Sequence, residues 1–92
     1  METIVIDGNL MTSRKAAHDL LAACLAFPPH YGRNLDALYD LLTERGKSTR
    51  LVLLHRGELE ELLGKYGAAL LETLEDAARA NPALHLLYEL DE

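Results

Sequence analysis

Cysteine and basic charge are both scarce in this chain of 92 residues. A single cysteine, Cys24, excludes an internal disulfide framework, and its helical neighbours Leu21 and Leu25 predict a small buried apolar thiol. Lysine and arginine number 9 against 15 acids, a formal net charge of −6. General nucleic-acid binding needs clustered bases, so we expect no nucleic-acid partner. The acidity fits either a cationic partner or simple solubility.

Membrane and export signals are also lacking. No apolar run reaches the roughly 20 residues that a membrane span requires. The opening residues METIVIDG have neither the basic stretch nor the apolar stretch of a signal peptide. We therefore expect a cytoplasmic protein without a membrane partner.

Recognisable catalytic motifs are absent as well. The sequence has no glycine-rich phosphate loop, no GxSxG and no CxxC, and its histidines lack HxxxH and HExxH spacing. We expect His18 on a solvated helix face, and His55 and His85 as hydrogen-bonded structural imidazoles. Asp36 and Asp40, four residues apart, are a weak metal signal by themselves. We expect no metal, no cofactor and no enzyme activity; a small acid–base enzyme using the two aspartates is an alternative.

The patterns that are present alternate between strand and helix. Three apolar segments predict strands, at residues 3–7, 50–55 and 84–90. Two helices are predicted in each interval, over 13–25 (capped by Thr12 or Ser13), 35–45, 58–67 and 68–81. Strands joined by helical crossovers pair in parallel. The sequence thus predicts a single α/β domain, residues 1–92, with a small three-stranded parallel sheet packed by about four helices.

Asn34 is a natural N-cap, and the helix that follows it has two unlike faces. Its leucines recur at helical spacing and predict a buried stripe, made of Leu35, Leu38, Leu41 and Leu42. At about 100° per residue, Asp36 and Asp40 lie roughly opposite that stripe. Asp36 falls in the first turn, where the helix dipole favours a carboxylate, whereas Asp40 has no base at a suitable spacing. Tyr39 lies near the boundary of the two faces, so the acidic side is a candidate contact surface.

The segment PPHYGRNLDALYDLL, residues 28–42, resembles the signature of the barstar family. That signature has a proline and one or two aromatics, then Y-G-x-N-L-D-A-L, an aromatic residue and an aspartate. The matching positions are Tyr31, Gly32, Asn34, Leu35, Asp36, Ala37, Leu38, Tyr39 and Asp40. The resemblance extends along the whole chain, from the first strand to the last.

Members of the barstar family are intracellular inhibitors of secreted guanyl-specific ribonucleases. The resemblance implies a one-to-one complex in which the second helix and its preceding loop plug the nuclease active site. Asp36 and Asp40 would replace RNA phosphates and pair with the enzyme's catalytic bases. The implied partner-binding residues are His30, Tyr31, Gly32, Asn34, Asp36, Tyr39, Asp40, Thr43 and Asp76.

Four positions depart from the family pattern. His30 stands where the family has a tyrosine, Tyr39 where it has a tryptophan, and Asp76 where it has a glutamate. Arg33 brings a positive charge next to the acidic surface, and Arg79 is spaced to pair with Asp76. A barstar-like interaction domain with a basic partner other than a nuclease is therefore a second alternative.

Overall fold

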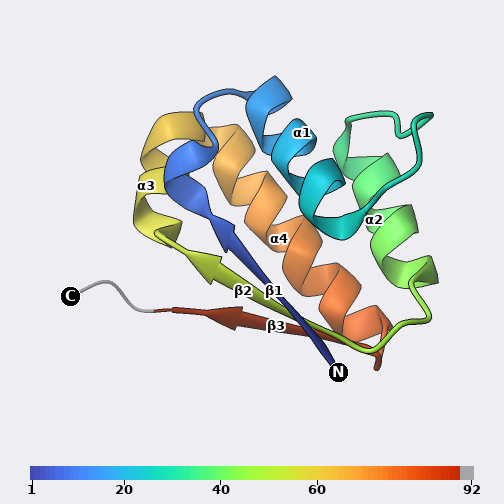
Figure 1. Cartoon of the computed structure of the whole chain (residues 1–92). Helices are drawn as coiled ribbons and strands as arrows, with labels where there is room; N and C mark the ends of the chain where they lie inside the picture. The colour runs from blue at the N-terminus through green and yellow to red at the C-terminus, as the bar shows by residue number, and fades with distance from the viewer. Residues whose placement is uncertain (90–92) are drawn as a thin grey trace.

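Strands and helices alternate along the computed structural model, which describes residues 1–89 (Figure 1). The elements are β1 (Glu2–Asp7), η1 (Gly8–Leu10), α1 (Arg14–Leu25), α2 (Leu35–Glu44), β2 (Thr49–Leu54), α3 (Arg56–Leu63), α4 (Lys65–Ala80) and β3 (Leu84–Tyr88). η1 is a short 3-10 turn. The predicted order of strands and helices is confirmed.

The three strands form one parallel sheet in the order β1-β2-β3. The register aligns Val5 of β1 with Val52 of β2, and Val52 with Leu87 of β3. The predicted fold class, an α/β domain with a small parallel sheet and four helices, is therefore confirmed.

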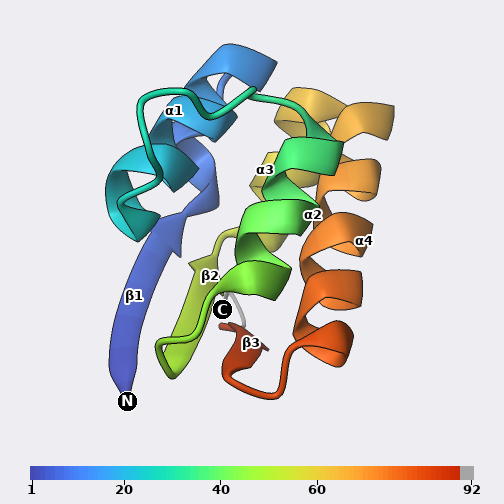
Figure 2. The same cartoon turned by 90° about the vertical axis from the view of Figure 1, so that its right-hand side faces the viewer.

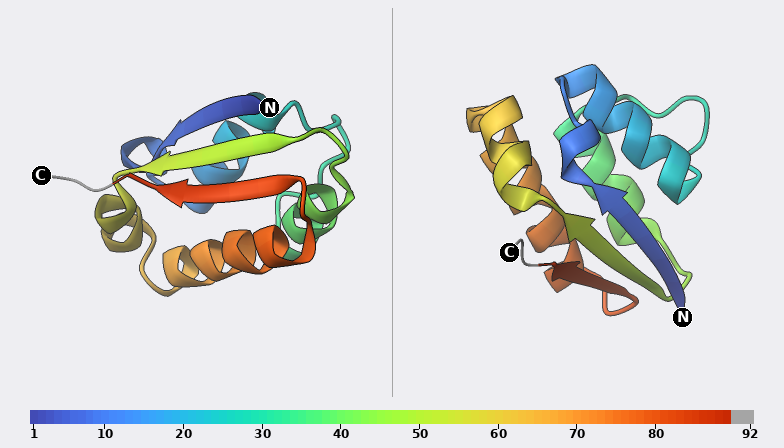
Figure 3. Two further views of the ribbon diagram at one scale, coloured as in Figure 1. Left: turned by 90° about the horizontal axis from the view of Figure 1, so that it is seen from below. Right: turned by 60° about the vertical axis from the view of Figure 1, so that its left-hand side comes forward.

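The helices lie on one side of the sheet (Figure 3, left). Ile6, Leu51 and Leu53 point to that side and are buried. On the opposite side Val5 is 54% exposed and Leu87 is 48% exposed. The apolar segment at 50–55 is thus the central strand of the sheet, but helices do not cover it on both faces.

Side-chain caps set the start of the two helices that precede β2. The Ser13 hydroxyl accepts the Ala16 backbone N–H at 3.0 Å, and the Asn34 side chain accepts the Ala37 N–H at 2.7 Å. Each satisfies a backbone donor that has no partner within its helix. Both predicted caps are confirmed, and Asn34 thereby fixes where the acidic helix begins.

The predicted boundary between the third and fourth helices is wrong. The first of them ends at Leu63, and the break falls at Gly64, whose φ of +60° suits glycine. Gly67 lies inside α4, where an added Cβ would lie 3.0 Å from the Leu59 carbonyl oxygen, a tight contact. The last strand ends at Tyr88, and its predicted final residue, Leu90, lies outside the described residues.

A buried asparagine anchors the end of α2. The Asn81 amide, at the C-terminus of α4, donates to the carbonyl oxygens of Leu42 at 2.8 Å and Arg45 at 2.9 Å. These carbonyls belong to the last turn of α2 and its C-cap, where intrahelical donors are lacking. Asn81 therefore holds α2 alongside α4. Figure 2 shows the two helices side by side.

Helix length bears on membrane insertion. The longest helix, α4, has 16 residues. Within residues 1–89, no helix combines the length and the apolar character that crossing a membrane requires.

Candidate protein-binding site

The outer face of α2 carries the two predicted aspartates. Asp36 and Asp40 are exposed, whereas Leu38 and Leu42 on the opposite side are completely buried. Tyr39 is 36% exposed and lies beside Asp40 on the solvent side. The prediction of a two-faced helix is confirmed, and the acids and the aromatic ring are available to another molecule.

Neither aspartate is neutralised by a base within residues 1–89. Among residues 1–89, no base forms an ion pair with Asp36 or Asp40. Arg45, the nearest base in sequence after Asp40, turns toward the sheet, where its guanidinium donates to Thr49 Oγ1 at 2.7 Å and Glu2 Oε1 at 2.8 Å. The outer face of α2 is therefore a negatively charged surface.

Glu44 extends this acidic surface, and the sequence analysis missed it. It is exposed and lies four residues after Asp40, so the same helical spacing that links Asp36 to Asp40 continues by one more turn. Within the described part of the chain, Glu44 also has no ion-pairing base. Reading the i, i+4 pattern to the end of the helix would have found it. We call Asp36, Asp40 and Glu44 the acidic stripe.

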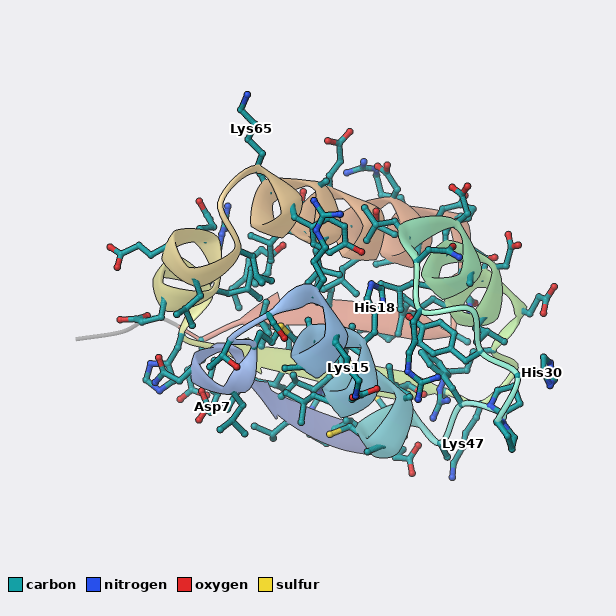
Figure 4. The ribbon with its side chains drawn as sticks, turned by 90° about the horizontal axis from the view of Figure 1, so that it is seen from above. Asp7, Lys15, His18, His30, Lys47 and Lys65 are labelled. Carbon is teal, nitrogen blue, oxygen red and sulfur yellow. The ribbon has the colours of Figure 1, made fainter. Side chains whose placement is uncertain are left out.

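Residues 26–34, which we call the contact loop, connect α1 to this helix. His30, Gly32 and Asn34 are exposed, and Figure 4 shows His30 at the periphery of the molecule. Tyr31 is different: it is only 5% exposed and its ring packs against Phe27, with 4.8 Å between the ring centroids. Tyr31, which the resemblance implies is a partner-binding residue, is therefore buried in the unbound chain. This residue belongs to the core and anchors the loop.

Arg33 does not neutralise the acidic stripe. Its backbone is in the left-handed region, with φ +52°, and its side chain Nε donates to Asp19 Oδ1 of α1 at 2.7 Å. Lys15 pairs with the other oxygen of Asp19 at 2.7 Å. The hydrogen bonds from these two bases hold the pKa of Asp19 below its ordinary value. The charge of Arg33 therefore fastens the contact loop to α1.

His18 is buried, which overturns the expectation of a solvated imidazole. It is 1% exposed, and its ring nitrogens lie 2.5 Å from the Tyr31 hydroxyl and 2.6 Å from the Tyr66 hydroxyl. Burial, reinforced by the Arg33 charge, lowers the pKa of His18 from its ordinary value of 6.5. Burial likewise raises the pKa of Tyr31 to about 12. His85, by contrast, is exposed on the uncovered side of the sheet and is not a buried structural imidazole.

Thr43 of α2 and Asp76 of α4 are the remaining partner-binding residues that the resemblance implies. The Thr43 hydroxyl is engaged within its own helix, donating to the carbonyls of Tyr39 at 2.9 Å and Asp40 at 3.1 Å. Asp76 lies on α4, which packs beside α2, and it forms the ion pair with Arg79 that the spacing predicts. A partner that uses Asp76 must therefore compete with or share Arg79.

The site offers acceptors and an aromatic ring on a helix surface. Within residues 1–89, no three His, Cys, Asp or Glu side chains gather as a metal site. Exposed carboxylates accept short, charge-assisted hydrogen bonds from arginine, lysine or protonated histidine. The arrangement is therefore suited to binding a cationic surface.

Comparison with known proteins identifies the family. Residues 1–89 match the family of barstar, the barnase inhibitor, and the chain belongs to that family. A relative in Bacillus subtilis (strain 168), named "Putative ribonuclease inhibitor YrdF", is 38% identical over 78 residues, which cover 84% of this chain and 86% of the relative. The family resemblance that the sequence motif indicated is therefore confirmed.

Proposed function

We propose that this chain inhibits a secreted guanyl-specific ribonuclease by placing α2 and the contact loop in the enzyme's active site. Membership of the barnase-inhibitor family and likeness to the Bacillus subtilis relative support ribonuclease inhibition in general. The guanyl-specific enzyme, the one-to-one complex and the cytoplasmic location are further parts of the proposal. The chain itself catalyses no step.

The acidic stripe is the observation that carries the proposal. A ribonuclease active site binds a polyanion and so presents converging bases. Within residues 1–89, Asp36 and Asp40 form no ion pair with a base of the chain, so an enzyme's bases can pair with them directly. Burying unpaired carboxylates against a neutral surface would cost several kcal/mol, which favours a cationic cleft over an apolar partner. The two carboxylates thus take the place of RNA phosphates.

The proposed contact surface combines the contact loop with α2 and the adjoining edge of α4. Its residues are His30, Gly32, Asn34, Asp36, Tyr39, Asp40, Thr43, Glu44 and Asp76. Tyr39 supplies an amphipathic ring of the kind enriched at interface centres, and Tyr31 supports the loop from below. An interface of ordinary size would bury about 1,600 Å² in total.

Such inhibition would protect a cell that makes its own ribonuclease. An enzyme synthesised in the cytoplasm would degrade the cell's RNA before export unless it is blocked there. An inhibitor in the same compartment, attracted by opposite charge, binds the enzyme quickly. We therefore propose a role in immunity to a self-made nuclease toxin.

A titration against a panel of secreted guanyl-specific ribonucleases tests the function. We expect RNA cleavage by at least one of them to stop near an equimolar ratio, and native mass spectrometry to give a one-to-one complex. The double variant Asp36→Asn/Asp40→Asn should lose inhibition. A matched control, Glu61→Gln/Glu72→Gln, removes the same charge from exposed positions on α3 and α4 and should retain it.

Three results would contradict the proposal. Tight binding to a basic protein without any effect on RNA cleavage would identify an interaction domain. Turnover of a substrate by the isolated chain would identify an enzyme. Equal loss of inhibition in the control double variant would mean that net charge, and not the acidic stripe, is responsible.

A further inference from the structure

His18 connects three separate parts of the chain through one imidazole ring. The ring comes from α1, Tyr31 from the contact loop, and Tyr66 from the first turn of α4. Nδ1 lies 2.5 Å from the Tyr31 hydroxyl, and Nε2 lies 2.6 Å from the Tyr66 hydroxyl. Figure 4 shows His18 in the interior, in contrast to the outward-pointing His30. We call this arrangement the His18 bridge.

The hydroxyl protons determine the protonation state that the bridge requires. Tyr31 is buried, and within residues 1–89 its hydroxyl has only His18 as a hydrogen-bond partner, so its O–H donates to Nδ1. Nε2–H then donates to the Tyr66 oxygen, and the half-buried Tyr66 can direct its own proton to water. A neutral imidazole with its proton on Nε2 satisfies every group.

A second proton on the ring breaks this pattern. Protonated Nδ1 can no longer accept from Tyr31, so the Tyr31 hydroxyl proton is left in a buried space without an acceptor. The new charge would also be repelled by Arg33 of the contact loop. Arg14 of α1 packs over the ring of Tyr66, with its guanidinium 4.2 Å from the ring centroid. Asp19 of α1 is the opposing acid, but it is already paired with Lys15 and Arg33.

We propose that neutral His18 is a positioning residue that holds the contact loop in its binding shape through Tyr31, and that a proton on His18 releases the loop and weakens ribonuclease binding. This inference rests on the proposed function, because it concerns the same surface. Tyr31 is followed directly by the exposed Gly32, Arg33 and Asn34, and Asn34 caps the acidic helix. Release of Tyr31 therefore disturbs the loop and the first turn of α2 together.

The test compares the pH dependence of inhibition in matched variants between about pH 8 and pH 5. His18→Gln keeps one donor and one acceptor but does not titrate, and Tyr31→Phe keeps the ring but removes the sensitive hydroxyl. For the wild type we expect the apparent dissociation constant to rise by up to about tenfold per pH unit below the pKa of His18. In both variants, the contribution of His18 to the pH dependence of the apparent dissociation constant should be lost. His85→Gln, an exposed histidine on the far side of the sheet, should keep it.

Titrating groups on the ribonuclease affect all four proteins equally, so the comparison between variants isolates His18. An identical slope in wild type and both bridge variants would overturn the inference. Circular dichroism across the same range separates loop release from unfolding; loss of global structure in step with binding would also overturn it.

The unbound protein provides a test that does not depend on the partner. NMR should find the His18 imidazole neutral with its proton on Nε2 at about pH 8, and amide exchange of Gly32 to Asn34 should accelerate as the ring titrates. Failure of the wild type to inhibit any nuclease at about pH 8 would contradict the proposed function but leave this result standing. If amide exchange in the contact loop did not change as His18 titrates, the His18 bridge would be contradicted and the proposed function would not.

Discussion

Negative charge is treated differently in two regions of the molecule. Near the start of the sheet and on α1, Glu2 and Asp19 are each paired with two bases. On the outer face of α2, the acidic stripe has no ion-pairing base among residues 1–89. The paired acids join elements that are distant in sequence, whereas the stripe forms no ion pair that would join elements within residues 1–89.

The difference separates charges that support the fold from charges available to a partner. Hydrogen bonds from Lys47 and Arg45 hold the pKa of Glu2 below its ordinary value, so ionised Glu2 stabilises the folded chain. The acidic stripe slightly destabilises the folded chain, because like charges at i, i+4 cost an isolated helix about 0.2–0.5 kcal/mol per pair. We therefore expect this exposed surface, which is slightly unfavourable for the isolated chain, to serve binding and not folding.

The largest expected effect comes from Asp40→Ala. Asp40 is exposed, and among residues 1–89 its side chain has no hydrogen-bond or ion-pair partner, so melting temperature and circular dichroism should change little. Loss of charge-assisted hydrogen bonds at the interface should weaken inhibition by about tenfold to a hundredfold. Inhibition assays together with thermal melts measure both quantities. A loss of stability as large as the loss of inhibition would mean that Asp40, like the paired acids, supports the fold. The distinction between the two groups of acids would then not hold.

Asn81→Ala should have the opposite profile. It removes the donors that hold the carbonyls of Leu42 and Arg45 and so loosens the attachment of α2 to α4. We expect the free energy of unfolding to fall by about 1–3 kcal/mol, measured by urea denaturation. Binding by the folded fraction should remain closer to wild type than in Asp40→Ala. Unchanged stability would show that Asn81 is not what secures the helix.

Much of the distinction between the buried and the exposed face of α2 could be predicted from the sequence. The faces of α2 followed from leucine spacing, and its start followed from the side chain of Asn34, because both depend on residues only a few positions apart. The exposure of Asp36 and Asp40 followed from the same spacing. Local signals were sufficient wherever the determining contacts were local.

The His18 bridge could not be predicted in this way. Its partners lie 13 and 48 residues away, so no local pattern connects them. His18 does share a helical face with Leu21 and Leu25, both buried, and that spacing was the available signal. We expected a solvated position because His18 is titratable. The two tyrosine hydroxyls that hydrogen-bond its ring inside the protein are brought there by the tertiary fold, which the local sequence does not reveal. The break at Gly64 instead of Gly67 has a similar origin, since the close contact with Leu59 is a property of helix packing.

Salt should affect the two regions unequally. Raising ionic strength from about 0.05 M to 0.5 M shortens the Debye length to a few ångströms and screens the long-range field of the acidic stripe. We expect the association rate constant with the ribonuclease to fall about tenfold, while the dissociation rate constant changes much less. Stopped-flow fluorescence measures the first and a competition chase the second. An association rate independent of salt would mean that the stripe does not steer the encounter.

The smallest expected effect concerns the paired acid Glu2. Its pKa lies below the ordinary value of 4.5 because Lys47 and Arg45 favour the ionised form, so its stabilising contribution is complete above pH 4.5 and is lost as pH falls through the lower value of the folded state. Glu2→Gln should therefore lower the melting temperature slightly near pH 7, and the difference should be smaller at about pH 3. Inhibition should not change, because Glu2 lies on β1, outside the proposed contact surface. Melting curves at the two pH values measure this difference in melting temperature. A difference that grows in acid would mean that the neighbouring bases do not hold Glu2 in its ionised form. The contrast between paired and unpaired acids would then depend only on the acidic stripe.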